Sequence, residues 1–181
     1  MKRVLISTGY KEYGYVNLAH ALASFNDIQV VLFTGLILPK SLVRSKIFLF
    51  LKKNTLLKSM NFRTMDDDSI LYIRNSLLEI IHWLSFQLSN KKLENWAIER
   101  YKCKLNLLLD KGFDYLVLRP GFCPKGSINA NTYLLLGIPY PDFIVNSLKD
   151  FGQSSDAYSS DFWQEVKNDL NKCNNIIINS T

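Results

Sequence analysis

Short apolar runs alternate along the chain with longer stretches in which apolar residues recur every three or four positions. Residues 3–8 (RVLIST), 28–33 (IQVVLF) and 115–118 (YLVL) are mainly β-branched and aliphatic, which is typical of parallel strands covered on both faces. A glycine-bracketed loop and the amphipathic stretch 15–25 lie between the first two runs. Strand, glycine loop, helix and strand in this order predict a βαβ unit with a right-handed crossover.

The rest of the chain continues the alternation of helices and strands. We expect a helix over 91–111 that ends at Gly112, and a long helix over 69–88 capped by the acidic run before it. The other predicted elements are helices over 128–136, with Gly137 as C-cap, and 161–173, a weak strand over 139–145 and a buried final strand over 175–179. This alternation predicts an α/β domain built on a doubly wound, mostly parallel sheet with helices on both faces.

Composition narrows the class of protein. The 181 residues are 48% hydrophobic and 21% charged, which is typical of one globular domain with a single core. The cysteines Cys103, Cys123 and Cys173 form no CxxC pair, so we predict reduced thiols and neither a zinc site nor a disulfide framework. The amino-terminal apolar run does not resemble a signal peptide, and no stretch is long enough to cross a bilayer. We therefore expect a cytoplasmic protein that is soluble or bound to the membrane surface.

The net charge of +6 arises largely from one basic segment and indicates an anionic partner. No acidic residue occurs between positions 38 and 63, where large apolar residues separate the cations. The residues predicted to bind the membrane are Lys40, Arg44, Lys46, Lys52, Lys53 and Lys58. Such a segment binds an anionic bilayer, although a solvated basic face over a packed helix would have the same pattern. Nucleic acid is disfavoured because no recognised binding motif accompanies the charge. We regard 38–111 as a helical, basic, insertion-like region within a domain that covers 1–181.

Three segments together carry a family resemblance. Residues 3–23 read RVLISTGYKEYGYVNLAHALA, residues 114–144 read DYLVLRPGFCPKGSINANTYLLLGIPYPDFI, and residues 161–181 read DFWQEVKNDLNKCNNIIINST. In their order and spacing they resemble the acceptor-binding, amino-terminal domain of GT-B glycosyltransferases, in particular the retaining family 4 (group 1) enzymes. The matching parts are an opening strand, glycine loop and helix, then a strand with the active-site loop, and finally the helix and strand that end this half. The resemblance implies a Rossmann-like fold.

The resemblance also implies a function. Such enzymes transfer a sugar from a nucleotide-sugar to a glycan or lipid-linked acceptor in envelope polysaccharide assembly, and a second Rossmann-like domain binds the donor. Nothing in the 181 residues corresponds to the carboxylate-rich donor motif. We therefore expect this half to bind no cofactor and to be inactive without a donor domain or a separate donor-binding subunit. The implied location is peripheral, on the inner face of the membrane.

Two loops that follow strands are the predicted sites for an acceptor or a phosphate. The candidate residues are Gly9, Tyr10, Gly14, Arg119, Gly121 and Lys125. The first three belong to a loop that leads into a helix amino terminus, which attracts anions, although a tight turn would explain the same glycines. Their spacing matches neither a P-loop nor GxGxxG. The last three follow a central strand, where open α/β sheets bind ligands, although ordinary exposed cations would look the same.

Few residues in the sequence are candidates for acid–base chemistry. Asp142 and Asp150 are the only candidate bases near the predicted edge, where a carboxylate would accept a proton from the attacking hydroxyl, although capping or turn roles explain both. His20 and His82 lie in predicted helices, and we expect them to be packed or surface residues. No histidine follows the strand at 115–118, where many members of the resembled family have one.

Two other functions fit the residues. The first is a non-catalytic subunit that anchors a separate donor-binding chain to the membrane. The second is a nucleotide-binding domain of flavodoxin type, which is disfavoured because no acidic cluster or hydroxyl-rich phosphate loop follows the first strand.

Overall fold

The computed structural model describes residues 1–7, 13–34, 37–38, 43–55, 63–64, 69–88, 90–136 and 160–178. Its strands are β1 (Lys2–Ser7), β2 (Ile28–Thr34), β3 (Ile37–Leu38), β4 (Arg63–Thr64), β5 (Ile70–Arg74), β6 (Tyr115–Leu118), β7 (Thr132–Leu136) and β8 (Asn175–Ile178). Its helices are α1 (Tyr13–Ala23), α3 (Lys46–Asn54), α4 (Ser76–Gln87), α5 (Lys91–Leu109) and α8 (Ser160–Lys172).

Six of these strands form one parallel sheet in the order β5-β2-β1-β6-β7-β8. Numbered along the sheet's own strands, this is the order 3-2-1-4-5-6 of the Rossmann fold. The prediction of a doubly wound, Rossmann-like α/β domain is confirmed. The flavodoxin-type alternative does not fit, because that fold has the order 2-1-3-4-5.

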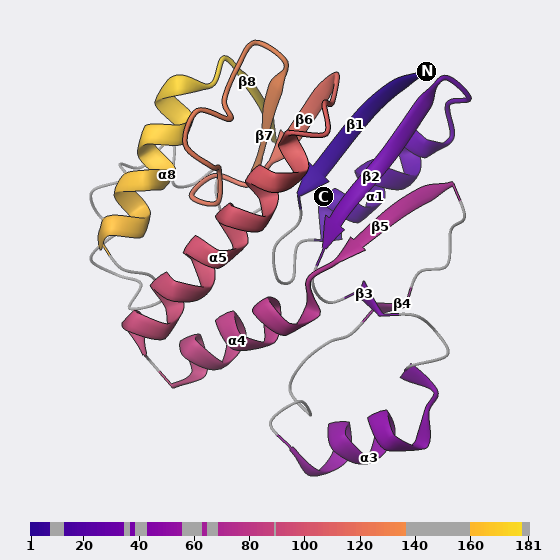
Figure 1. The fold of residues 1–181 in the computed structure, drawn as a ribbon, viewed down its shortest axis with the longest axis vertical. Coiled ribbons are helices and arrows are strands. Elements are labelled where there is room, and N and C mark those ends of the chain that lie inside the picture. Colours follow the sequence, from indigo (N-terminus) through magenta and orange to yellow (C-terminus); the bar gives the residue numbers. More distant parts are fainter. Residues whose placement is uncertain are drawn as a thin grey trace.

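Helices cover both faces of the sheet (Figure 1). Alternate residues of a strand point to opposite faces, so Leu5 packs with α5 and α8 while its neighbours Val4 and Ile6 pack with α1. Leu5 and Ile6 are fully buried, as are Leu118 and Leu134 further along the sheet. This two-sided burial explains why consecutive residues in the middle of the central strands, such as 4–6 of β1 and 30–33 of β2, are apolar.

The segment predicted as one helix over 69–88 is instead a strand followed by a helix. Residues 70–74 form β5, which pairs with β2 from Val30↔Ile70 to Thr34↔Arg74. Ile70 is buried and Leu71 is 54% exposed, whereas Tyr72 and Ile73 are half-buried, so the strand is only partly covered, as expected at a sheet edge. Asn75 separates it from α4. The predicted basic region 38–111 therefore supplies an edge strand and the covering helix α5 to the main sheet.

The predicted helix over 128–136 is also wrong, because residues 132–136 form β7 between β6 and β8. The apolar run is too short for its hydrophobic periodicity to distinguish a helix from a strand. Pairing with β6 makes it a strand. The final strand was predicted to be buried, but β8 is an edge strand on which Ile176 is 42% exposed. The predicted cap Gly137 and strand 139–145 lie outside the described residues.

Other boundaries agree closely with the predictions. The helices expected over 15–25, 91–111 and 161–173 are α1, α5 and α8, each displaced by two residues or fewer at its ends. Gly112 has a φ of 72° and its N–H donates to the carbonyl of Leu109, as expected for a glycine that ends a helix.

Candidate functional site

The topological switch point of the sheet lies at the carboxyl edge between β1 and β6. These strands are neighbours, paired from Val4↔Tyr115 to Ile6↔Val117. Beyond β1 the chain enters α1 on one face, whereas beyond β6 it enters a loop whose Phe122 and Cys123 pack with α5 and α8 on the other. The strand order reverses here, and ligands of open α/β sheets bind at such switch points.

Five buried side chains meet at this edge, and we call them the edge cluster: Ser7, His82, Tyr101, Arg119 and Phe122. Ser7 ends β1, and its Oγ lies 2.7 Å from the Tyr101 hydroxyl of α5. The Tyr101 ring lies 5.5 Å from the Phe122 ring and 4.8 Å from the Phe33 ring. Aromatic packing and this hydrogen bond therefore join the ends of β1, β2 and β6 to α5.

Arg119 is the first residue after β6 and is only 6% exposed. Its guanidinium carbon lies 4.3 Å from the centre of the Phe122 ring, which is a cation–π contact. A planar guanidinium oriented by a ring is suited to bidentate binding of a phosphate or carboxylate. Arg119 thus directly follows a central strand, as the sequence indicated, and its role in binding a ligand stays a prediction.

His82 reaches the same edge from α4, which the sequence did not predict. Its ring lies 5.7 Å from the Phe122 ring in an edge-on arrangement. Burial, reinforced by the positive charge of Arg119, lowers the pKa of His82 from 6.5 to about 4. The imidazole is therefore neutral at pH 7 and able to donate one hydrogen bond and accept another.

The other two predicted residues of this loop have different surroundings. Gly121 is buried with a φ of 80°, and its N–H donates to Asp169 Oδ2 of α8 over 2.8 Å. In this conformation Gly121 holds the loop against α8. Lys125 is exposed and lines a groove between α5 and α8. The three residues predicted in this loop therefore have different positions: Arg119 belongs to the edge cluster, Gly121 contacts α8, and Lys125 lines the groove.

The amino end of α1 lies at the same edge of the sheet. Tyr15, in its first turn, donates a 2.7 Å hydrogen bond from its hydroxyl to the carbonyl of Leu135 near the end of β7. Gly14 belongs to this first turn, where backbone N–H groups have no partner within the helix. The predicted residues Gly9, Tyr10, Asp142 and Asp150 lie outside the described residues.

A second candidate surface lies on α3, which projects from the body of the molecule below the carboxyl end of β2 (Figure 1). The α3 surface consists of four large exposed apolar residues, namely Ile47 at 75%, Phe50 at 67%, Leu49 at 52% and Leu51 at 42%. Ile47, Phe50 and Leu51 have the spacing of one helix face. Ser45 caps the helix by accepting a hydrogen bond from the N–H of Phe48.

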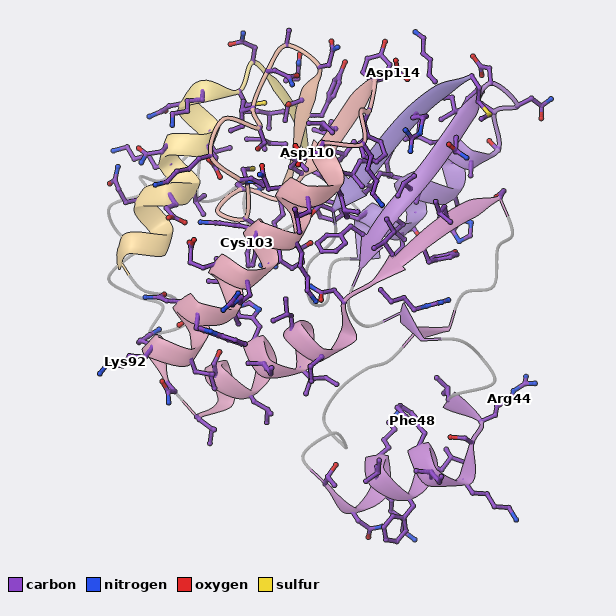
Figure 2. The ribbon with its side chains drawn as sticks, in the orientation of Figure 1. Arg44, Phe48, Lys92, Cys103, Asp110 and Asp114 are labelled. Carbon is purple, nitrogen blue, oxygen red and sulfur yellow. The ribbon has the colours of Figure 1, made fainter. Side chains whose placement is uncertain are left out.

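Cations border this apolar face. Lys46 and Lys53 are exposed on α3, Lys52 is half-buried, and Arg44 precedes the helix and points away from the body (Figure 2). Phe48 is buried instead. The other predicted membrane-binding residues, Lys40 and Lys58, lie outside the described residues. In the described part of the chain, no helix combines the length and apolarity needed to cross a bilayer.

The described residues contain no cluster of three or more His, Cys, Asp or Glu side chains placed to hold a metal ion. No protein-family model matches the chain, and neither curated protein sequences nor solved structures give a significant match.

Proposed function

We propose that this chain is the acceptor-binding domain of a nucleotide-sugar-dependent glycosyltransferase of GT-B architecture, acting at an anionic membrane surface. One observation carries the proposal: α3, with its exposed apolar and cationic residues, lies on the same side of the molecule as the carboxyl edge of the sheet (Figure 1). The chain reaches β3 directly from the carboxyl end of β2, and β3 pairs with β4 at the base of this projection. A membrane under α3 would present a lipid-linked sugar to that edge.

The edge cluster supplies binding and positioning in this proposal. Arg119 would hold the phosphate or diphosphate of the lipid-linked acceptor, because a guanidinium pairs with both oxygens of such a group. The neutral His82 beside it would orient a sugar hydroxyl by hydrogen bonding. The hydroxyl would attack the anomeric carbon of the donor, which a second Rossmann-like domain would supply. Catalysis would then consist mainly of positioning and charge stabilisation.

The α3 surface supplies the membrane contact. Each cation near an anionic bilayer contributes about 1 kcal/mol to binding, and transfer of the apolar side chains into the interface is also favourable. Both contributions favour peripheral binding at the inner face of the membrane, where the proposal places the enzyme.

The role of Arg119 is testable with lipid vesicles. For the wild-type chain, we expect a polyprenyl-diphosphate-linked hexose in phosphatidylglycerol vesicles to strengthen co-sedimentation about tenfold over plain vesicles, because a bound diphosphate adds to the α3 contact. Arg119→Gln should remove this gain and leave binding to plain vesicles unchanged, and Arg119→Lys should retain part of it because the charge remains. Binding curves and thermal unfolding of each variant are the measurements.

Arg100→Gln is the matched control, because Arg100 is an exposed arginine of α5 that stacks on Trp96 away from the edge cluster. Equal losses in the Arg119 and Arg100 variants would contradict the proposed site. If the wild-type chain bound plain vesicles and gained nothing from the linked sugar, the chain would be a membrane anchor without an acceptor site.

A further inference from the structure

A groove of about 560 Å³ lies between α5 and α8, on the side of the sheet that these helices cover, and it shares no residue with the edge cluster. Its walls come from α5, from the loop between β6 and β7, and from α8. The volume lies within the range of about 300–1,000 Å³ that small-molecule sites occupy. Figure 2 labels Cys103, which marks the α5 wall. No step of the proposed reaction uses this groove.

The two helices are tied together by ion pairs at the groove. Lys102 of α5 has a side chain only 13% exposed, and its Nζ lies 2.5 Å from Glu165 of α8 and 3.3 Å from Glu99. Burial disfavours the charged form, yet the Glu165 and Glu99 carboxylates outweigh it and raise the pKa of Lys102. Asp169 of α8 accepts the N–H of Gly121 and fixes the loop that forms the third wall. The groove is therefore held in shape before any ligand enters.

Two cations of the groove stay available to a ligand. Lys125 of the loop and Lys172 of α8 are exposed, and neither forms an ion pair or side-chain hydrogen bond with a described residue. The amides of Asn106 and Asn168 also line the groove. The groove thus combines fixed carboxylate acceptors, amide groups and two exposed ammonium donors.

This lining fits one class of ligand. A sugar hydroxyl donates one hydrogen bond and accepts others, so it pairs with carboxylates and ammonium groups at once. No aromatic side chain is among the described residues of the groove, so a nucleobase would find no ring on which to stack. The two exposed ammonium groups favour a ligand that also carries a negative charge. An acidic saccharide meets all three conditions.

We propose that the α5–α8 groove is a binding site for acidic saccharides, which contacts Lys125 and Lys172 through the carboxylate or phosphate of the sugar. The site goes beyond the proposed function, because it lies between α5 and α8 and needs neither the membrane nor the edge cluster. In an enzyme that extends an acidic glycan, it would hold sugar units at a distance from the reacting hydroxyl.

Titration of the 181-residue chain with trigalacturonic acid tests the proposal, with maltotriose as the neutral counterpart. We expect the acidic trisaccharide to bind and the neutral one to bind about tenfold more weakly. Lys125→Glu/Lys172→Glu should weaken binding of the acidic trisaccharide at least about tenfold, because both exposed cations become like charges. Both positions are exposed, and thermal unfolding of the double variant should match that of the wild type.

Lys92→Glu/Lys167→Glu is the matched control, since it makes the same change of charge at exposed lysines of α5 and α8 that do not line the groove. Unchanged binding by this control supports the groove. Equal weakening in both double variants, or no binding of trigalacturonic acid to the wild-type chain, overturns the proposal. Since the titration contains no lipid, its failure would leave the vesicle result for Arg119 standing.

Discussion

Replacing Ile47 and Phe50 by serine is expected to weaken binding to anionic vesicles about 100-fold. These side chains are the most exposed apolar residues of α3, at 75% and 67%. If each buries about half of its apolar area in the bilayer interface, it contributes on the order of 1.5 kcal/mol. Together they supply about 3 kcal/mol, which is roughly a factor of 100 in the binding constant. Sedimentation of the double variant with phosphatidylglycerol vesicles at several salt concentrations measures this effect.

Phe25→Ser/Leu107→Ser is the control for that experiment, because it removes one aromatic and one aliphatic side chain, 57% and 67% exposed, that lie in the turn after α1 and on α5. The control variant should bind vesicles as the wild type does. Added salt should weaken wild-type binding only in part, since the apolar contribution is not screened. Similar losses in both double variants would show that the chain binds lipid through nonspecific hydrophobic contacts and not through the α3 surface.

His82 is expected to make folding stability fall by about 3 kcal/mol between pH 7 and pH 4. Burial, reinforced by the charge of Arg119, lowers its pKa from 6.5 to about 4 in the folded chain. In this pH window the unfolded chain therefore binds a proton that the folded chain does not. Proton binding therefore stabilises the unfolded state as the pH falls, so folding stability is lost on acidification and not on alkalinisation.

Denaturant unfolding of the wild type and of His82→Gln at pH 7, 6, 5 and 4 checks this effect. The carboxyl groups of the buried Glu94 and the half-buried Asp169 titrate in both proteins, so the difference between the two curves isolates the imidazole. The wild type should lose about 3 kcal/mol relative to His82→Gln as the pH falls. His20→Gln removes the chain's other histidine and serves as the control. Parallel pH profiles for the wild type and His82→Gln would contradict the buried position of His82.

The fold could be predicted from the sequence wherever a burial pattern was decisive. The strands β1, β2 and β6 contain runs of consecutive apolar residues because both faces are covered, and α1 and α5 show a helical stripe. The segments that became β5 and β7 are short and apolar, and their conformation depends on the strands beside them. Pairing with strands distant in the sequence determines the conformation of β5 and β7, and the local hydrophobic periodicity does not indicate this pairing.

The candidate site was predicted in part. Arg119 was found because it directly follows a recognisable strand, and the carboxyl ends of parallel strands are where ligands bind. His82 and Tyr101 were missed as site residues because only the packing of α4 and α5 brings them to Phe122. Ser7 could have been predicted as a site residue, since it has a hydroxyl group and stands at the end of the first strand. The groove involves α5 and α8, which are far apart in the sequence, and no motif indicated it.

Photo-cross-linking tests the central claim most directly, namely that the edge between β1 and β6 binds the acceptor. The probe is a polyprenyl-diphosphate-linked sugar with a diazirine on the sugar, present in anionic vesicles with the wild-type chain. The proposal predicts adducts in the peptides that follow β1 and β6, including Arg119 to Cys123. Adducts confined to α3, or to the opposite edge around Arg3 and Gly112, would contradict it.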